Sequence, residues 1–356
     1  MRLLPANNSS NRQPKTTRIV ILGGGFGGVS TARHLEGLCR RRSDVEIVLV
    51  SQDNFVVLTP LLFEVCSGTL EARHCSLPIR AFLRNTRFIE AAVEGIDLER
   101  RVVRLSGERE RGELAYDQLV LALGSKTNRK MIPGSEHAFT FKTLADAFLL
   151  RNHIIERFER ADAESDPNRK RRHLTFVIVG GGLVGVELFG ELTAFVDGIT
   201  PLYKHVNRDE VRFLLLQGGD RIMPEMNLEL ADYGARVLAK RRGVTLRTNT
   251  LVRAIEPVKV HLPEETIEAE TIILAAGIVP NPVVAGQAVD KNKRGHMVVD
   301  GTPKQQAARS VAFRRPPCTS EAQTDPRSAR RSTGTSGPAA RSRDASQLEA
   351  PRRTRQ

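Results

Sequence analysis

The chain has 356 residues, 40% of them apolar, which is enough for two or three domains with buried cores. No run approaches the ~18 apolar residues of a transmembrane helix, and the four cysteines show neither C-x-x-C nor C-x4-C spacing, which argues against a membrane span, a zinc site and a dithiol redox centre. The net charge is +13, but residues 303–356 hold twelve Lys or Arg against four Asp or Glu, so the excess is mostly a property of this tail.

The first predicted unit follows a polar stretch, residues 1–16, which lacks the apolar core of a signal peptide and predicts a disordered arm. Arg18–Leu22 is an apolar, β-branched run typical of a buried strand. It leads into G-x-G-x-x-G and then into a helical pattern; the spaced glycines are Gly23, Gly25 and Gly28. In such a turn the first glycine makes the bend, the second admits a pyrophosphate and the third packs helix on strand. The alternative is a tight βα corner that binds nothing.

The next stretch predicts further strands of the same unit. Residues 45–50 read as its second strand, which ends in Ser51 where nucleotide sites of this kind often have an acid. The ribose contact is therefore assigned either to Ser51 or to Asp53. A broken stretch follows from residue 53 to 77, then a strand pair within residues 91–103, and a buried strand over residues 119–125 that ends in a glycine turn.

A second copy of the glycine turn comes 157 positions after the first. The spacing predicts a helix over residues 143–160 and a polar linker over 161–172, followed by the strand 174–179. The second set of glycines is Gly180, Gly182 and Gly185. A helix over 183–196, a strand over 211–217, a helix over 228–241 and strands over 244–252 and 266–276 complete this unit. Two independent turns indicate two dinucleotide-binding units in an α/β chain.

Regular patterning stops after Gly301. Residues 303–356 contain six Pro and many Ser, Thr and Ala, with almost no periodic apolar positions, which predicts a basic disordered tail. Two alternatives are an electrostatic tether to anionic lipid or nucleic acid and a frame-shifted end of the coding sequence.

Several motifs together resemble one family. They are the turn at residues 23–28, Thr59-Pro60-Leu61-Leu62 with Gly68, Tyr116-Asp117 leading to Ala122-Leu123-Gly124-Ser125, the turn from Gly180 to Glu187, and Ala275-Ala276-Gly277-Ile278 with Pro280-Asn281-Pro282. This set resembles the flavoproteins with two dinucleotide-binding domains, and within them type II NADH dehydrogenase, the single-subunit NADH:quinone oxidoreductase. The resemblance covers roughly residues 17–301. It implies two Rossmann-like domains: an FAD domain (17–145 and 266–302) interrupted by an NAD(P)H domain (146–265).

The resemblance also implies an activity and a set of site residues. NADH would pass a hydride to FAD, and the electrons would go on to a quinone in a non-proton-pumping respiratory reaction. The residues expected to bind the cofactors are Gly23, Gly25, Phe26, Gly28, Ser51, Thr59, Pro60, Ala122, Gly124, Gly180, Gly182, Gly185, Gln217 and Gly277. Glu187 is the expected catalytic residue, for orientation or proton supply; the alternative is a first-turn acid that favours the helix dipole. No metal is expected.

Two features set this chain apart from the family pattern. Gln217 stands where the family often has an acid that binds the adenine ribose, which predicts that NADPH is tolerated; the alternative is a surface glutamine. Residues after Gly301 do not match the family's third flavin motif, which ends in Gly-Asp. A nucleotide-binding protein with impaired or no turnover is therefore the alternative function. The expected location is the cytoplasm or the inner face of its membrane, without a specific nucleic-acid partner, and a homodimer is left open.

Overall fold

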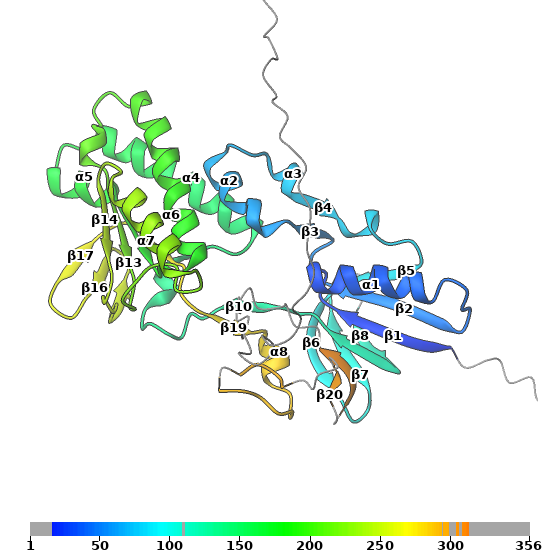
Figure 1. Ribbon diagram of the computed structural model, residues 1–356. Helices are drawn as coiled ribbons and strands as arrows, with labels where there is room; N and C mark the ends of the chain where they lie inside the picture. The colour runs from blue at the N-terminus through cyan, green and yellow to red at the C-terminus, as the bar shows by residue number, and fades with distance from the viewer. Residues whose placement is uncertain (1–15, 109–110, 294, 299–303, 306–307, 313–356) are drawn as a thin grey trace, which may run out of the picture. The chain divides into compact units, whose positions relative to one another are not determined.

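The computed structural model describes residues 16–108, 111–293, 295–298, 304–305 and 308–312 (Figure 1). Within these residues the fold contains two mainly parallel β-sheets, each flanked by helices on one face and by a small antiparallel sheet on the other. None of the helices in these ranges is both long and apolar enough to cross a membrane.

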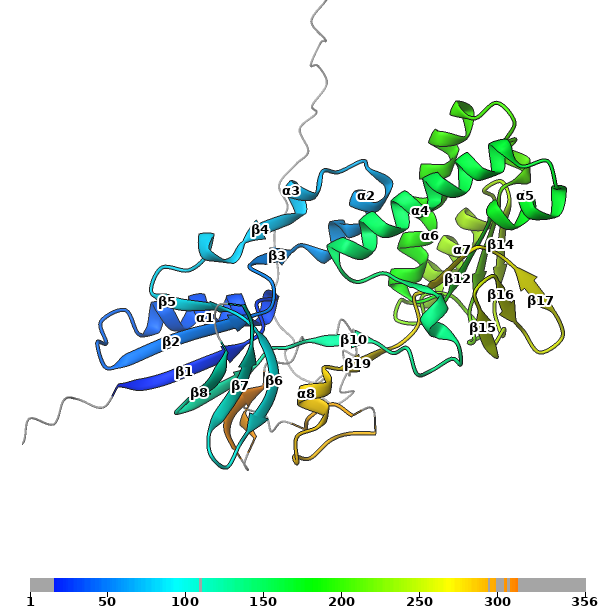
Figure 2. The same cartoon turned by 180° about the vertical axis from the view of Figure 1, so that it is seen from behind.

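The first sheet has the order β20-β21-β9-β1-β2-β5 and is parallel except between β20 and β21. Its strands are β1 (Thr17–Leu22), β2 (Val45–Ser51), β5 (Thr86–Glu90), β9 (Gln118–Leu121), β20 (Lys304–Gln305) and β21 (Ala308–Ala312). Helix α1 (Phe26–Leu38) covers one face of this sheet, as Figures 1 and 2 show from opposite sides. The other face packs on β6 (Ala92–Asp97), β7 (Val102–Ser106) and β8 (Gly112–Ala115).

The second sheet has the order β11-β18-β12-β13-β14 and is parallel throughout. Its strands are β11 (Phe139–Thr140), β12 (Thr175–Val179), β13 (Arg212–Leu216), β14 (Val244–Arg247) and β18 (Thr271–Leu274). On one face lie α4 (Leu144–Ala163), α5 (Pro167–His173), α6 (Leu183–Ile199) and α7 (Leu228–Ala239), with η4 (Thr200–Leu202) and η5 (Arg208–Glu210). On the other face lie β15 (Ala254–Glu256), β16 (Lys259–His261) and β17 (Thr266–Glu268).

The remaining elements connect these layers. Between β2 and β5 come β3 (Phe55–Val57), η1 (Thr59–Leu61), α2 (Leu62–Ser67), α3 (Ala72–Cys75), β4 (Ser76–Pro78) and η2 (Ile79–Ala81). The chain passes between the two sheets through β10 (Ser125–Thr127) and β19 (Ile278–Pro280), which pair antiparallel. η3 (Ser135–His137) precedes β11, and α8 (Pro282–Ala285) follows β19.

The two large sheets confirm the α/β class with two Rossmann-like domains, but they move the predicted boundaries. The predicted return to the first domain at residue 266 is wrong, because β18 pairs with β12 in the second sheet. The predicted start of the second domain at residue 146 is also too far along the chain, because β11 (Phe139–Thr140) already pairs with β18 in the second sheet. These pairings join segments about a hundred residues apart, so local patterning did not indicate them.

Two segments predicted to be irregular are regular in the structure. The expected linker over residues 161–172 holds the end of α4 and most of α5, which begins after Asp166 as N-cap with Pro167 in its first turn. The predicted tail begins with β20 and β21, and β21 extends the first sheet beside β9. The rest of the tail, residues 313–356, lies outside the described residues, as does most of the predicted arm.

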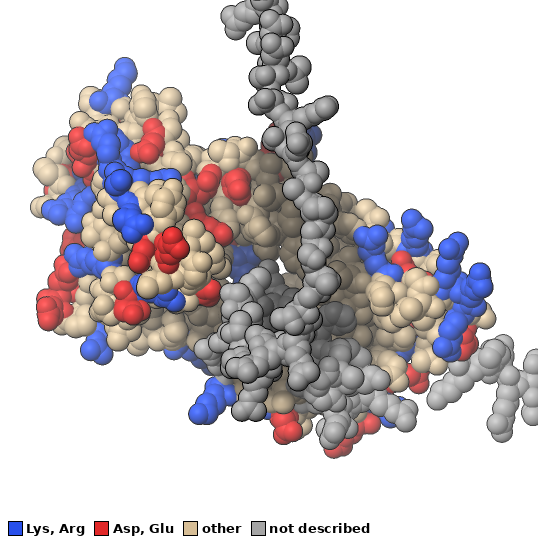
Figure 3. Space-filling model, in the orientation of Figure 1, with Lys and Arg blue, Asp and Glu red and all other residues tan. Residues whose placement is uncertain are grey.

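Acidic and basic side chains are interspersed over the described part of the face in Figure 3. This mixture agrees with the near balance of charge expected for the chain before residue 303.

Candidate functional site

The first glycine turn lies at the carboxyl end of β1, where α1 begins. Gly23 adopts φ +108, a region that favours glycine, and a Cβ there would overlap the carbonyl oxygen of Ala122. A Cβ on Gly28 would overlap the carbonyl oxygen of Gly23. A Cβ on Gly25 would meet nothing within 4 Å. The outer glycines therefore hold strand and helix together, and the middle one leaves an open space over the helix N-terminus.

The second turn repeats this geometry at the end of β12. Gly180 adopts φ +113 and packs on Ala276, whose backbone N would lie 2.8 Å from an added Cβ. A Cβ on Gly185 would overlap the carbonyl oxygen of Gly180. At Gly182 the nearest atom would be a carboxylate oxygen of Glu225, 3.4 Å away at the end of a flexible side chain. The middle glycine of the first turn thus faces open space, and that of the second faces only the end of a flexible side chain.

Neither helix supplies an anion to its own N-terminus, although the carboxylate of Glu225 lies beside Gly182 at the start of α6. The N-caps of α1 and α6 are Gly25 and Gly182, and neither helix has a side-chain cap or an acid in its first turn. The first-turn N–H groups and the positive end of each helix dipole can therefore bind a phosphate. Each glycine turn, together with the helix N-terminus that follows it, is called a cradle below. Each cradle has the shape and the N–H donors that a dinucleotide pyrophosphate requires.

Among the other residues predicted for the first site, Ser51 is buried at the glycine turn, whereas the rest of those described here are exposed. Ser51, the last residue of β2, is 9% exposed and lies against Gly24 of the turn, whereas Asp53 is exposed. Phe26 is the first residue of α1 and is 47% exposed. Thr59 and Pro60 are exposed on η1, which leads directly into α2. Ser51 is thus brought to the turn, and η1 is brought to the start of α2.

Gly124 and Gly277 lie at the two ends of the chain crossing between the sheets. Both adopt positive φ, +68 and +69, directly before β10 and β19. The carbonyl of Gly124 accepts a hydrogen bond from Asn281 N at 3.1 Å, and that of Gly277 accepts one from Asn128 N at 3.2 Å. These glycines therefore fix the two turns from which the paired link strands start.

Gln217 follows β13 and reaches back to the second turn. Its Oε1 accepts a hydrogen bond from the backbone N of Gly181 at 2.9 Å. Its Nε2 would lie 3.2 Å from a Cβ on Gly219. The side chain presents an uncharged amide beside the glycine turn, where a carboxylate would repel a 2′-phosphate.

Glu187 lies on the second turn of α6, close to the second cradle. The side chain is exposed on the helix surface. Desolvation and the negative charge of Glu64 nevertheless raise the pKa of its carboxyl. Glu187 is therefore easier to protonate than an ordinary glutamate, as a residue that holds and releases protons requires.

Two charged residues near these elements were missed by the sequence reasoning. Lys142 precedes the N-cap of α4 and donates from Nζ to Ser125 Oγ at 2.7 Å, and burial lowers the pKa of its ammonium. Glu64 lies on α2, with one buried carboxylate oxygen. Their contacts join segments far apart in the chain, so no local signal indicated them.

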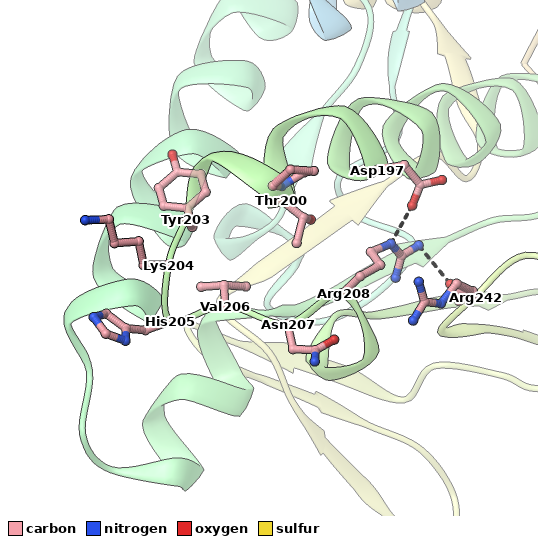
Figure 4. Close-up of a pocket in the computed structure, with 10 residues that line it drawn as sticks. Asp197, Thr200, Tyr203, Lys204, His205, Val206, Asn207, Arg208 and Arg242 are labelled. Carbon is pink, nitrogen blue, oxygen red and sulfur yellow. Dashed lines mark hydrogen bonds and ion pairs between the residues drawn. The ribbon is translucent and has the colours of Figure 1, made fainter.

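A pocket of about 560 Å³ lies at the opposite end of α6 from the glycine turn (Figure 4). The Arg208 guanidinium lining it is already held by Asp197 and by the carbonyl of Arg242. Because α6 has 17 residues, the pocket is about 25 Å from the second cradle. None of the residues predicted to bind a cofactor lines this pocket.

The matched turns on two parallel sheets define a protein with two dinucleotide-binding domains. A sequence model of the pyridine nucleotide-disulphide oxidoreductases matches residues 17–308. The chain therefore belongs to the pyridine nucleotide-disulphide oxidoreductase family.

Two curated relatives illustrate the similarity. A mitochondrial external alternative NADH-ubiquinone oxidoreductase of Yarrowia lipolytica is 29% identical over 320 residues, which is 81% of this chain and 54% of that protein. The type II NADH:quinone oxidoreductase Ndh of Mycobacterium tuberculosis is 29% identical over 260 residues, 71% of this chain and 54% of that protein. The chain thus spans about half the length of the curated relatives it matches.

Solved structures agree on the fold. NDH2 from Plasmodium falciparum, in complex with NADH, superposes with a TM-score of 0.75 at 23% identity, over 83% of this chain and 63% of that one. The sulfide:quinone oxidoreductase of Aquifex aeolicus superposes with a TM-score of 0.66 at 20% identity, over 83% of this chain and 68% of that one.

Proposed function

We propose that the chain binds FAD at the first glycine turn and NADH at the second, and transfers electrons from NADH to a quinone. The observation that carries the proposal is the pair of matched cradles, each closed at its outer glycines, with open space or only the end of a flexible side chain at the middle one. The relatives named as NADH:quinone oxidoreductases support the assignment of the two nucleotides and of the acceptor.

The residues of the first cradle fit FAD. The open side of Gly25 and the free N–H groups of α1 would hold the pyrophosphate, and Ser51 or Asp53 would contact the ribose. Thr59 and Pro60 would line the ring system from η1. When bound, FAD supplies the hydride acceptor and the donor of two electrons.

The residues of the second cradle fit NADH in the same way. Gly182 and the first turn of α6 would hold the pyrophosphate, and Gln217 would face the adenine ribose. Glu187 would hold a proton at its carboxyl beside the nicotinamide and quinone region, which its raised pKa favours. The amide of Gln217 would admit NADPH as well. Attachment to a membrane surface and a homodimer stay predictions of the family resemblance.

The test is the absorption spectrum of the purified protein, taken without oxygen before and after NADH is added. We expect a flavin spectrum that bleaches with NADH and recovers when a soluble quinone is added. Gly25→Ala is the matched variant, expected to lose the flavin because its new methyl group enters the space reserved for the pyrophosphate.

A colourless protein that NADH alone stabilises against heat would contradict this function and favour nucleotide binding without turnover. If the flavin absorption bleaches with NADH but never recovers when a quinone is added, the proposed transfer from NADH to FAD stands and the proposed quinone acceptor is wrong.

A further inference from the structure

The loop between β13 and α7, residues 217–227, is fastened to the second glycine turn at Gly181. Gly181 N donates to Gln217 Oε1 at 2.9 Å, and Gly181 O accepts from Met223 N at 2.7 Å. Ile222 is 3% exposed, and its side chain would lie 3.1 Å from a Cβ added to Gly181. The loop therefore uses both hydrogen-bonding groups of Gly181 and fills the space beside it.

Met223 holds this loop in an unusual backbone conformation. Its φ is +47, in the left-handed region that a residue other than glycine rarely adopts. The end of its side chain lies over Gly234 of α7, where an added Cβ would come within 2.5 Å of the Met223 methyl group. Met226 N donates to the carbonyl of Met223 at 2.9 Å. These contacts fix the turn from which the side chain of Glu225 extends.

The carboxylate of Glu225 lies beside the middle glycine of the second cradle. A Cβ added to Gly182 would be 3.4 Å from Glu225 Oε1 and 4.0 Å from Glu225 Oε2. The side chain is exposed, and within the part of the chain that the structure describes it has no hydrogen-bond partner and no ion-pair partner. The negative charge of Glu225 is therefore not neutralised by a neighbouring cation, and it stands at the N-terminus of α6.

The two cradles differ in this respect. A Cβ added to Gly25, the middle glycine of the first cradle, would meet no atom of the described residues within 4 Å. The second cradle has the same turn and the same free N–H groups, but a carboxylate lies next to the place where they would hold a phosphate. An anion that enters the second cradle must therefore approach a fixed negative charge.

A carboxylate in this place acts differently on different nucleotides. The two phosphates of a dinucleotide are diesters, each with one negative charge. The last phosphate of ADP or ATP is a monoester whose second ionisation occurs at about pH 6, so it carries almost two negative charges at pH 7. Because Coulomb repulsion grows with the charge of the anion, the carboxylate disfavours ADP and ATP more than a dinucleotide.

We propose that Glu225 is a specificity-determining residue that selects against nucleotides ending in a phosphate, and so gives the second cradle its preference for dinucleotides. The proposal rests on the proposed function, because it takes the second cradle as the NADH site. Glu225 also repels the pyrophosphate of NADH, but by a smaller factor. Specificity here comes from a repulsive group rather than from an additional contact with the preferred ligand.

The test compares ADP with ADP-ribose by equilibrium dialysis at low salt. Both ligands contain adenosine and two phosphates, but the second ribose leaves the last phosphate of ADP-ribose with one charge instead of almost two. We expect Glu225→Gln to tighten ADP binding by about tenfold and ADP-ribose binding by about threefold, so the preference for ADP-ribose falls about threefold. Glu225→Asp keeps the charge and should keep most of the preference. Added salt should reduce the difference between wild type and Glu225→Gln.

Glu229→Gln is the matched control, because Glu229 is an exposed acid in the first turn of α7 and its loss changes the net charge by the same amount. It should leave the preference unchanged, and both glutamine variants should unfold at the wild-type temperature, as expected for exposed side chains. An equal preference in wild type and Glu225→Gln would overturn the proposal and leave the proposed function standing. Weaker ADP-ribose binding in Glu225→Gln would also overturn it, because Glu225 would then attract the nucleotide.

These binding measurements need neither flavin nor quinone. A protein that loses its preference in Glu225→Gln but transfers no electrons from NADH to a quinone would contradict the proposed function and support the role of Glu225. If wild type and all variants bind neither ligand, the second cradle is not a nucleotide site and both proposals are wrong.

Discussion

The two kinds of glycine in each turn predict opposite effects of the same substitution. Alanine at Gly185 would overlap the carbonyl oxygen of Gly180, so strand and helix must move apart. Alanine at Gly182 meets only a flexible carboxylate at 3.4 Å, and the backbone there, with φ −71, suits any residue. The first change should therefore damage the fold and the second only the binding of a ligand.

The expected magnitudes follow from these contacts. Overpacking in a closed contact costs about 1–3 kcal/mol or more, so Gly185→Ala should lower the midpoint of thermal unfolding by several degrees. Gly182→Ala should leave the midpoint unchanged. It should weaken NADH binding by about 10- to 150-fold, since a hydrogen bond to a charged group is worth about 1.5–3 kcal/mol.

Scanning calorimetry and equilibrium dialysis with NADH are suitable assays, because the protein has no tryptophan to report unfolding. Gly28→Ala and Gly25→Ala repeat the comparison in the first turn with FAD as ligand. If Gly182→Ala binds NADH as tightly as wild type while remaining folded, the middle glycine does not form a phosphate cradle and the reasoning is refuted.

Three further predictions concern charged and polar side chains. Gln217→Glu should raise the preference for NADH over NADPH in kcat/KM by about tenfold, or about 1.4 kcal/mol of repulsion from the 2′-phosphate; an unchanged ratio would contradict this. Arg157→Leu should cost about 3–5 kcal/mol in calorimetry, because it removes the guanidinium from the mostly buried Glu270 and leaves only the imidazole of His173 beside that carboxylate, whereas the exposed Arg160→Leu should cost less than about 1 kcal/mol. Lys142→Met should be more stable than wild type at pH 7. Because the folded-state pKa of Lys142 is lowered, the difference should shrink as pH rises toward 10.5, and a constant difference would argue against burial as its cause.

The sequence was sufficient for the two turns because their signals are local. A buried strand, three glycines at fixed spacing and a helical stripe occur within about 18 residues, and the structure confirms a steric reason for the first and the third glycine of each turn. Helix α5 was missed although Asp166 and Pro167 carry an N-terminal signal, because its polar composition suggested a linker.

The parts that were missed depend on contacts between distant segments. The membership of β18 in the second sheet depends on pairing with β12, about a hundred residues earlier. The environment of Glu187 depends on Glu64, which precedes it by 123 positions and lies on a helix that sequence order assigns to the other domain. Periodicity within one window contains no information on either contact.

The pairing of β10 with β19 has a consequence for the history of this architecture. Ser125 and Pro280 are partners in register, so the segment from residue 128 to residue 277 leaves the first domain and returns to it at the same place. A segment whose two ends meet can be added to or removed from a host domain without opening the sheet of either one. The pair of β10 and β19 therefore marks the junction at which the second nucleotide-binding domain is inserted into the first.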